Sequence, residues 1–222
     1  MAMTTARRPL ILGAGACALG LLAGAPARAA AAKPADRVFD VLRRGSTIGR
    51  HRITFRQSGG QILADTDIQL AVRAAFIVVF RYRQTGEDVW EDGALVRSDV
   101  ATNDDGKESR VTLGRAGDRL AGRGPRGAID LPLGSMTDLN WYDRRIMERP
   151  QVLDAQNGAV NPLVRQGPLT ETIEVGGRQI QATRYEVAAG SQSGIIWYDE
   201  TGSWTKGILR TKGEELDYRL VG

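Results

Sequence analysis

The chain of 222 residues has 30 basic and 26 acidic residues, a net charge of +4, one cysteine and one histidine. Three basic residues and no acidic ones lie in residues 1–30, so the remainder has 27 basic against 26 acidic residues, a net charge of +1. This balance does not indicate nucleic acid or an anionic membrane surface as a partner. Because Cys17 also lies in residues 1–30, a disulfide and a thiolate metal site are excluded from the rest of the chain.

Residues 1–29 have the pattern of an export signal. Arg7 and Arg8 precede an apolar run of glycine, alanine and leucine, and an Ala-Arg-Ala sequence then suits a signal peptidase. The apolar run has about fifteen residues, fewer than the ~20 needed for a membrane-spanning helix. The arginine pair favours the twin-arginine route, with an ordinary Sec signal as the alternative. We therefore expect residues 1–29 to be cleaved, residues 30–37 to form a flexible leader, and the protein to be periplasmic.

Residues 38–222 are expected to form a single β domain. Apolar and polar residues alternate at 38–42 and 51–55 on either side of a glycine turn, which predicts a hairpin with one apolar face. A longer strand at 62–72 follows with the same alternation. The sequence AAFIVVF at 74–80 is an uninterrupted apolar run, which is typical of a strand covered on both faces.

The rest of the chain continues as short strands between turns. Such closely spaced turns are typical of an all-β barrel or sandwich, and tight turns make neighbouring strands antiparallel. We predict an all-β fold with one large curved antiparallel sheet, a half-barrel or open barrel of roughly a dozen strands. Residues 122–127 are interpreted as a mobile loop. Further strands are expected at 88–90, 95–101, 109–114, 119–121, 160–164, 170–175, 179–187, 195–199, 204–210 and 216–220.

Residues 135–156 interrupt the strand pattern and predict one short helix. Ser135 or Thr137 can cap its start, with Asp138 in capping-box position, and Pro150 ends it. Its apolar stripe consists of Met136, Leu139, Tyr142 and Ile146. We expect this helix to pack across the concave side of the sheet, either as a plug of the core or as a lid over a ligand.

Several short patterns together resemble a known family. They are Phe39-x-Val41-x-x-x-Gly45-x-x-Ile48-Gly49-x-His51, Tyr82-Arg83 with Glu87-x-x-Trp90, Leu153-Asp154-Ala155-Gln156-Asn157-Gly158, and Trp197-Tyr198-Asp199 with Gly202-x-Trp204. Over residues 39–220 the chain resembles an uncharacterised family of exported proteobacterial all-β proteins. The resemblance implies a curved antiparallel sheet, similar in outline to periplasmic lipoprotein carriers of the LolA/LolB type. It implies no activity and no catalytic residues.

A search for catalytic and metal-binding patterns finds little. His51 is the one imidazole, its position in the strand alternation directs it inward, and we interpret it as a hydrogen-bonded structural histidine. No Gly-x-Ser-x-Gly sequence is present. Residues 103–108 resemble a calcium loop but lack its ligand spacing, which favours a solvated hairpin turn. We expect no catalytic residue, no metal and no cofactor.

Aromatic residues and the polar groups near them give the candidate binding site. Trp141 lies off the predicted stripe, at the margin of the helix, where the mouth of a pocket would be. The candidate ligand-binding residues are Tyr82, Trp90, Asn140, Trp141, Tyr142, Asp154 and Gln156. The alternative for each aromatic residue is a place in an ordinary core.

Three functions remain open from the sequence. The first is an exported protein that binds a hydrophobic or amphipathic, lipid-like ligand without catalysis. The second is a structural or protein-interaction module of the envelope with a solid core. The third is a hydrolase-type enzyme that uses His51 or Asp154.

Overall fold

The computed structural model describes residues 1–2 and 33–221, so the expected export signal lies almost entirely outside the described residues. Residues 33–36 have no regular structure, and the Lys33 ammonium donates a hydrogen bond to the Phe55 carbonyl oxygen at 3.0 Å. In the described part of the chain, no helix is long and apolar enough to cross a membrane.

Strands make up most of the described chain. Those of the first half are β1 (Arg37–Arg43), β2 (Ser46–Ser58), β3 (Gln61–Ala74), β4 (Ile77–Glu91), β5 (Ala94–Asp104), β6 (Lys107–Ala116), β7 (Arg119–Gly124) and β8 (Gly127–Pro132). Those of the second half are β9 (Gln151–Leu153), β10 (Val160–Pro162), β11 (Val164–Val175), β12 (Arg178–Ala189), β13 (Gln192–Tyr198), β14 (Trp204–Thr211) and β15 (Glu214–Leu220).

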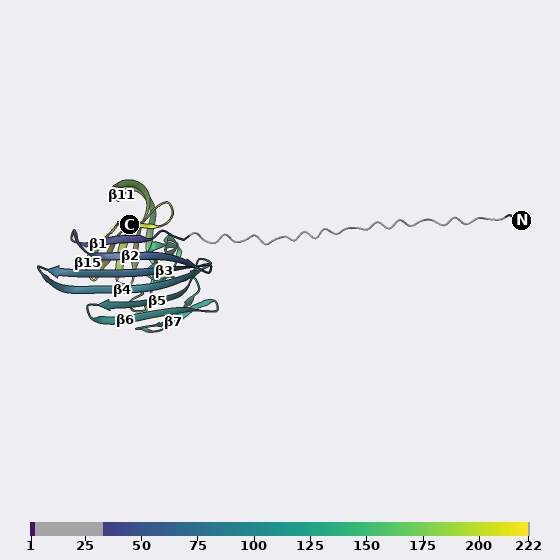
Figure 1. The fold of residues 1–222 in the computed structure, drawn as a ribbon, viewed down its shortest axis with the longest axis horizontal. Helices are drawn as coiled ribbons and strands as arrows, with labels where there is room; N and C mark the ends of the chain where they lie inside the picture. The colour runs from purple at the N-terminus through teal and green to yellow at the C-terminus, as the bar shows by residue number, and fades with distance from the viewer. Residues whose placement is uncertain (3–32, 222) are drawn as a thin grey trace. The chain divides into compact units, whose positions relative to one another are not determined.

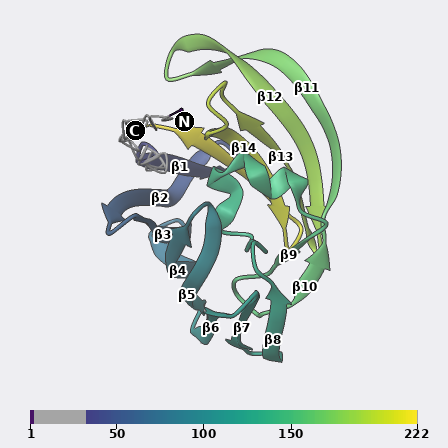
Figure 2. The ribbon, with the colours of Figure 1, turned by 90° about the vertical axis from the view of Figure 1, so that its right-hand side faces the viewer.

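Thirteen of these strands form one antiparallel sheet, and β9 and β10 form a separate pair. The order in the sheet is β11-β12-β13-β14-β15-β1-β2-β3-β4-β5-β6-β7-β8, so the last strand pairs with the first and the two edges are β11 and β8. The sheet curves strongly without closing (Figure 1, Figure 2). The prediction of a large, curved, open antiparallel sheet is confirmed.

One glycine in the first hairpin is required by close packing. Gly49 lies where the pairing of β1 with β2 shifts register, and a Cβ there would come 1.9 Å from the Gln69 carbonyl oxygen. Any other residue would push β2 away from β3. The glycine in the Ile48-Gly49-x-His51 pattern therefore has a structural reason.

The main core lies on the concave face of the sheet. It draws on both halves of the chain, through residues such as Phe39, Ile53, Leu95, Leu120 and Tyr198. A smaller cluster of Ile173, Ala182 and Trp197 is separate from it. Trp197 alternates along β13 with the core residues Ile196 and Tyr198, which places this small cluster on the opposite face.

Two predictions about strands and loops are wrong. The run at 74–80 is not a covered strand: residues 75 and 76 form the turn between β3 and β4, and Phe76 is fully exposed. The run contains a hairpin turn at which Ala75 has a φ of 53°, so its residues lie at a tip instead of inside the sheet. Residues 122–127 are also not one loop, because β7 continues to Gly124 and β8 begins at Gly127.

The expected helix at 135–149 is replaced by two short 3-10 turns, η1 (Asn140–Tyr142) and η2 (Arg144–Glu148). Three short polar side chains explain this, because each accepts a hydrogen bond from nearby backbone and so competes with a continuous helix. The Thr137 hydroxyl accepts from Leu139 N at 3.2 Å, the Asn140 side-chain oxygen Oδ1 from Thr137 N at 2.8 Å, and the Asp143 carboxylate from Arg145 N at 2.9 Å. Asp143 itself is extended, with φ −116° and ψ 112°.

The predicted apolar stripe is nevertheless buried. Met136, Leu139, Tyr142 and Ile146 all belong to the main core, on the concave side of the sheet. Figure 2 shows this segment within the curve of the strands. The periodicity therefore predicted which side chains are buried, although the backbone that presents them is not an α-helix.

Candidate functional site

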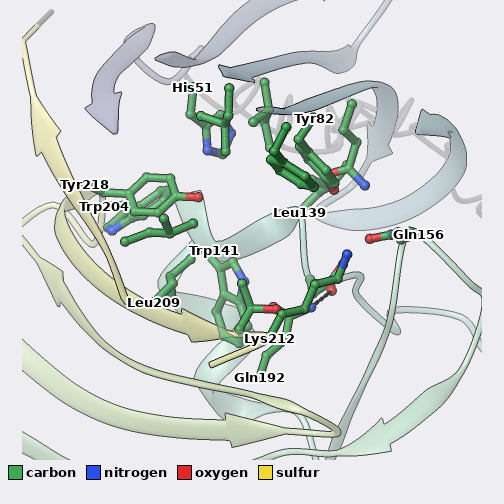
Figure 3. A pocket seen from close by; sticks show the side chains of 17 residues that line it. His51, Tyr82, Leu139, Trp141, Gln156, Gln192, Trp204, Leu209, Lys212 and Tyr218 are labelled. Carbon is green, nitrogen blue, oxygen red and sulfur yellow. Dashed lines mark hydrogen bonds between the residues drawn. The ribbon is translucent and has the colours of Figure 1, made fainter. Parts of the chain in front are cut away.

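A cavity of about 150 Å³ lies between the segment at 138–156 and the concave face of the sheet. Figure 3 shows the side chains around it, which come from β2, β3, β4, the start of β13, β14, β15, the turn between β14 and β15, and the segment at 138–156. The lining residues are His51, Ile68, Leu70, Phe80, Tyr82, Gln84, Asp138, Leu139, Trp141, Gln156, Gln192, Trp204, Leu209, Thr211, Lys212, Leu216 and Tyr218.

Stacked aromatic rings form one wall of the cavity. The Trp204 ring lies 4.2 Å from that of Phe39 and 5.2 Å from that of Tyr218, measured between centroids. Its indole N–H donates to the Lys206 carbonyl oxygen at 2.7 Å, and a Cβ on Gly207 would lie 2.9 Å from the ring. The missing side chain at Gly207 thus leaves room for the indole, which is fixed by these contacts.

The rim near Lys212 is polar, and its amide and ammonium groups form hydrogen bonds or ion pairs with two carboxylates. Lys212 forms an ion pair with Asp104, and the Gln156 side-chain amide donates to the same carboxylate at 3.0 Å. On the other side, the Gln192 amide donates to Asp138 at 3.1 Å. These residues come from four separate parts of the chain, so the rim forms only when the sheet is assembled.

Asp138 is a partly buried carboxyl at this rim. Burial raises its pKa to about 7, and the nearby Asp154 carboxylate acts in the same direction. Hydrogen bonds from Ala155 N at 2.8 Å and from Gln192 oppose that change by favouring the charged form. The group therefore changes charge near neutral pH.

His51 lies inside the cavity wall, beside Trp204 and Tyr218, with only 4% of its surface exposed. Neither ring nitrogen has a hydrogen-bond partner among the described residues. Burial lowers the pKa of His51 to about 3, so the ring is neutral at physiological pH. The inward orientation was predicted correctly. The interpretation as a hydrogen-bonded histidine was wrong, because the strands bring no polar partner to it.

Another group of predicted residues lies in a polar cluster that does not line the cavity. The Asn140 amide donates to the Asp88 carboxylate at 2.6 Å, and the Trp90 indole N–H donates to the Tyr142 hydroxyl at 2.9 Å. The Tyr142 hydroxyl also lies 3.5 Å from the Asp88 carboxylate. All four residues are buried, and burial raises the pKa of Asp88 to about 6. We call Asp88, Trp90, Asn140 and Tyr142 the Asp88 cluster.

The structure separates the predicted site residues into three places. Tyr82, Trp141 and Gln156 line the cavity. Trp90, Asn140 and Tyr142 belong to the Asp88 cluster. Asp154 organises a turn, since its carboxylate accepts from Gln156 N at 2.8 Å and from the Asn157 side-chain amide at 2.7 Å.

Several cavity residues were not among the predicted site residues. Trp204 is an aromatic residue like Tyr82 and Trp141 and could have been included on that signal. Gln192 and Lys212 lie at the ends of hairpins, and no local pattern connects them with Asp138 or Asp104. Asp138 was expected to help cap a helix, but its carboxylate accepts from Ala155 N instead.

The cavity lining combines apolar side chains with a few polar ones. The imidazole of His51 has no hydroxyl or carboxylate within hydrogen-bond reach among the described residues, so it forms no nucleophile–base pair there. The described residues also contain no group of three or more histidine, cysteine, aspartate or glutamate side chains placed to hold a metal ion. What the site offers is an apolar interior, a polar rim and one unpartnered imidazole.

Comparison with known proteins identifies the family and the fold. Residues 39–221 match the family described as "Domain of unknown function (DUF6134)". A search of curated proteins finds no match. A similar solved structure has a TM-score of 0.59 and 12% sequence identity, covering 84% of this chain and 94% of that chain. It is described as the crystal structure of a beta-barrel-like protein of domain of unknown function DUF1849 from Brucella abortus, and at this identity the likeness shows the fold alone.

Proposed function

The chain belongs to the DUF6134 family of unknown function, and we propose that it is an exported, periplasmic protein that binds an amphipathic, lipid-like molecule in the cavity under residues 138–156. In this proposal the protein carries or senses the molecule and catalyses no reaction on it. The export signal predicted for residues 1–29 supports the location. The cavity itself is the single observation that supports the ligand.

The size and lining of the cavity limit what can enter. An apolar cavity of this volume is comparable with one that takes up benzene, so it accommodates one ring or a short alkyl segment. The rim provides the Gln156 and Gln192 amides and the Lys212 ammonium, which can contact a polar head group. A longer lipid would therefore be enclosed only at one end.

His51 adds a requirement at the inner end of the cavity. A buried imidazole without a partner is unfavourable by roughly 1–3 kcal/mol, and a ligand atom that hydrogen-bonds to it would remove that cost. A ligand with a hydroxyl or carbonyl group beyond its apolar segment fits this arrangement better than a plain alkyl chain. The neutral ring can either donate or accept such a hydrogen bond.

The alternative of an envelope interaction module depends on the free edges of the sheet. β11 is a long edge strand on which Val164 and Leu169 are exposed, which offers a surface for pairing with another chain. The same strand contains Pro168, which has no N–H to donate, and its pairing with β12 is irregular there. These features are typical of edges that resist pairing, and so they favour the cavity as the site of function.

The test is to recover the protein from cells that make the full chain and to identify bound molecules by native mass spectrometry and lipid extraction. We expect an amphipathic molecule to be bound to the wild-type protein and absent from Leu216→Phe, which places an aromatic ring in the cavity. Leu169→Phe makes the same change on exposed β11 and should retain the molecule. Circular dichroism verifies that both variants fold. Wild-type protein without a bound molecule, or Leu216→Phe with one, would argue against the proposal.

A further inference from the structure

The hairpin of β3 and β4 projects beyond the rest of the sheet. β2 pairs with β3 only as far as Leu70, and β5 pairs with β4 only from Tyr82 onward, whereas β3 and β4 continue to pair as far as Ala74 and Ile77. The intervening residues 71–81 therefore form a two-stranded ribbon without a neighbouring strand on either side. In Figure 1 this hairpin extends past the β1–β2 and β5–β6 hairpins at the same end of the sheet.

The tip of this ribbon is apolar and exposed. Phe76 is fully exposed, Ile77 is 70% exposed and Val79 is 54% exposed. Ala74 and Ala75, beside them, are exposed as well. Isolated apolar residues on a surface need no explanation, but a cluster with a fully exposed aromatic ring at the end of a projection is unusual for a protein in water.

Basic side chains lie along the same ribbon, from near its tip to its base. Arg73, Arg81 and Arg83 are exposed, and no acidic residue occurs between Asp67 and Glu87. None of the three arginines forms a salt bridge within the described part of the chain. An acidic residue of the turn between β5 and β6 lies beside the ribbon, because the Asp105 carboxylate accepts from the backbone N–H of Arg81 at 3.2 Å. The net charge of the chain does not show this local excess, because it averages over the whole surface.

We propose that the tip of the β3–β4 hairpin docks on an anionic phospholipid bilayer, with Phe76, Ile77 and Val79 inserted among the lipids and the three arginines at the head groups. Apolar side chains that enter the interface while basic side chains contact anionic head groups are the combination that holds peripheral proteins on membranes. A stable protein partner would need about 800 Å² on this side, far more than a few side chains at a hairpin tip provide. A bilayer accepts such a tip without a complementary surface.

The position of the hairpin also relates the membrane to the cavity. Leu70, Phe80 and Tyr82, at the base of the ribbon, line the cavity. Docking at the tip would bring the rim of the cavity toward the bilayer, where amphipathic molecules are found. This link between the bilayer and the cavity depends on the proposed function, whereas docking of the hairpin does not.

The experiment is co-sedimentation with vesicles of phosphatidylcholine, with and without phosphatidylglycerol. Every variant is expressed as the full chain and used in the form recovered from the cell envelope, so all share the same N-terminus. We expect the wild-type protein to bind the anionic vesicles, and Phe76→Ser with Ile77→Ser to lower the partition coefficient at least tenfold.

Val164→Ser with Leu169→Ser is the control: it removes exposed apolar side chains from β11 and should leave binding unchanged. Arg73→Gln with Arg81→Gln should weaken binding and reduce its dependence on salt.

A second readout reports insertion directly. Phe76→Trp should show an emission shift to shorter wavelength on anionic vesicles, whereas Leu169→Trp should not. The proposal is overturned if the wild-type protein does not bind anionic vesicles, if the serine variant of the tip binds as well as wild type, or if the Phe76→Trp variant shows no shift. Because these experiments use no cavity variant, their failure would leave the cavity proposal standing, and failure of the cavity proposal would leave the docking standing.

Discussion

The segment at 135–156 has two sides, and they differ in how their polar groups are satisfied. Tyr142 and Asn140 belong to the Asp88 cluster, where Trp90 donates to Tyr142 and Asn140 donates to Asp88. Trp141, between them in sequence, faces the cavity, where His51 has no partner among the described residues. One short segment therefore fills the core on one side and covers the cavity on the other.

This difference supports the cavity side as the proposed site for a ligand. The Asp88 cluster is linked by hydrogen bonds that fix its geometry, although one oxygen of the Asp88 carboxylate has no partner among the described residues. A cluster of this kind contributes mainly to a unique, rigid core. The cavity combines an apolar interior with an unpartnered imidazole, and so retains capacity for contacts that the protein itself does not make. Substitutions in the Asp88 cluster and substitutions in the cavity should accordingly differ in their effect on stability.

The largest effect expected at neutral pH is loss of stability from Asn140→Ala. The substitution removes the hydrogen bond to buried Asp88 and the one that Asn140 accepts from Thr137 N. We expect the free energy of unfolding to fall by about 3 kcal/mol, measured by urea denaturation at neutral pH. The matched change on the cavity side, Gln156→Ala, breaks one contact at the rim and should cost less than about 1 kcal/mol. Equal losses would show that the two sides do not differ as described.

The next effect is a change in acid stability from His51→Phe. The pKa of His51 is lowered from 6.5 to about 3, so between these values the unfolded chain binds a proton that the folded protein does not. Stability from this group is therefore present above pH 6.5 and lost as the pH falls toward 3. The phenylalanine variant should gain stability relative to wild type by up to about 1.4 kcal/mol per pH unit in this window. Denaturation of both proteins at several pH values measures this, and a difference that does not vary with pH would contradict it.

A smaller effect on stability, with the opposite dependence on pH, is expected from Asp138→Asn. The pKa of Asp138 is raised from 3.8 to about 7, so its contribution to stability is fully present below 3.8 and lost as the pH rises through 7. The asparagine variant should be more stable than wild type above neutral pH, with the difference disappearing in acid. Partial exposure to solvent keeps the effect modest. Asp130→Asn is the control, because hydrogen bonding to Arg119 lowers the pKa of exposed Asp130 and places its titration below this window.

Sequence patterns were sufficient for the sheet because a strand is specified by local alternation and local turns. The alternation at 62–72, for example, correctly placed Ala64, Ile68 and Leu70 in the core. The same kind of pattern failed at 135–149, where hydrogen bonds of Thr137, Asn140 and Asp143 with the backbone compete with helical periodicity.

The cavity was only partly predictable for a different reason. Tyr82, Trp141 and Gln156 were found through aromatic and polar composition, but composition could not separate them from the residues of the Asp88 cluster. The rim depends on pairs distant in sequence, such as Gln192 with Asp138 and Lys212 with Asp104. Such pairs follow from the curvature and register of the sheet, which leave no signal in a local window of sequence.

The most direct test of the cavity as a binding site is quenching of tryptophan fluorescence by decanoate that carries bromine on its terminal carbon. Trp141 and Trp204 line the cavity, whereas Trp90 and Trp197 do not. We predict saturable quenching in wild type and in Leu169→Phe, little quenching in Leu216→Phe, and none with unbrominated decanoate. Quenching of equal strength in Leu216→Phe, or no saturable quenching in wild type, would contradict the account.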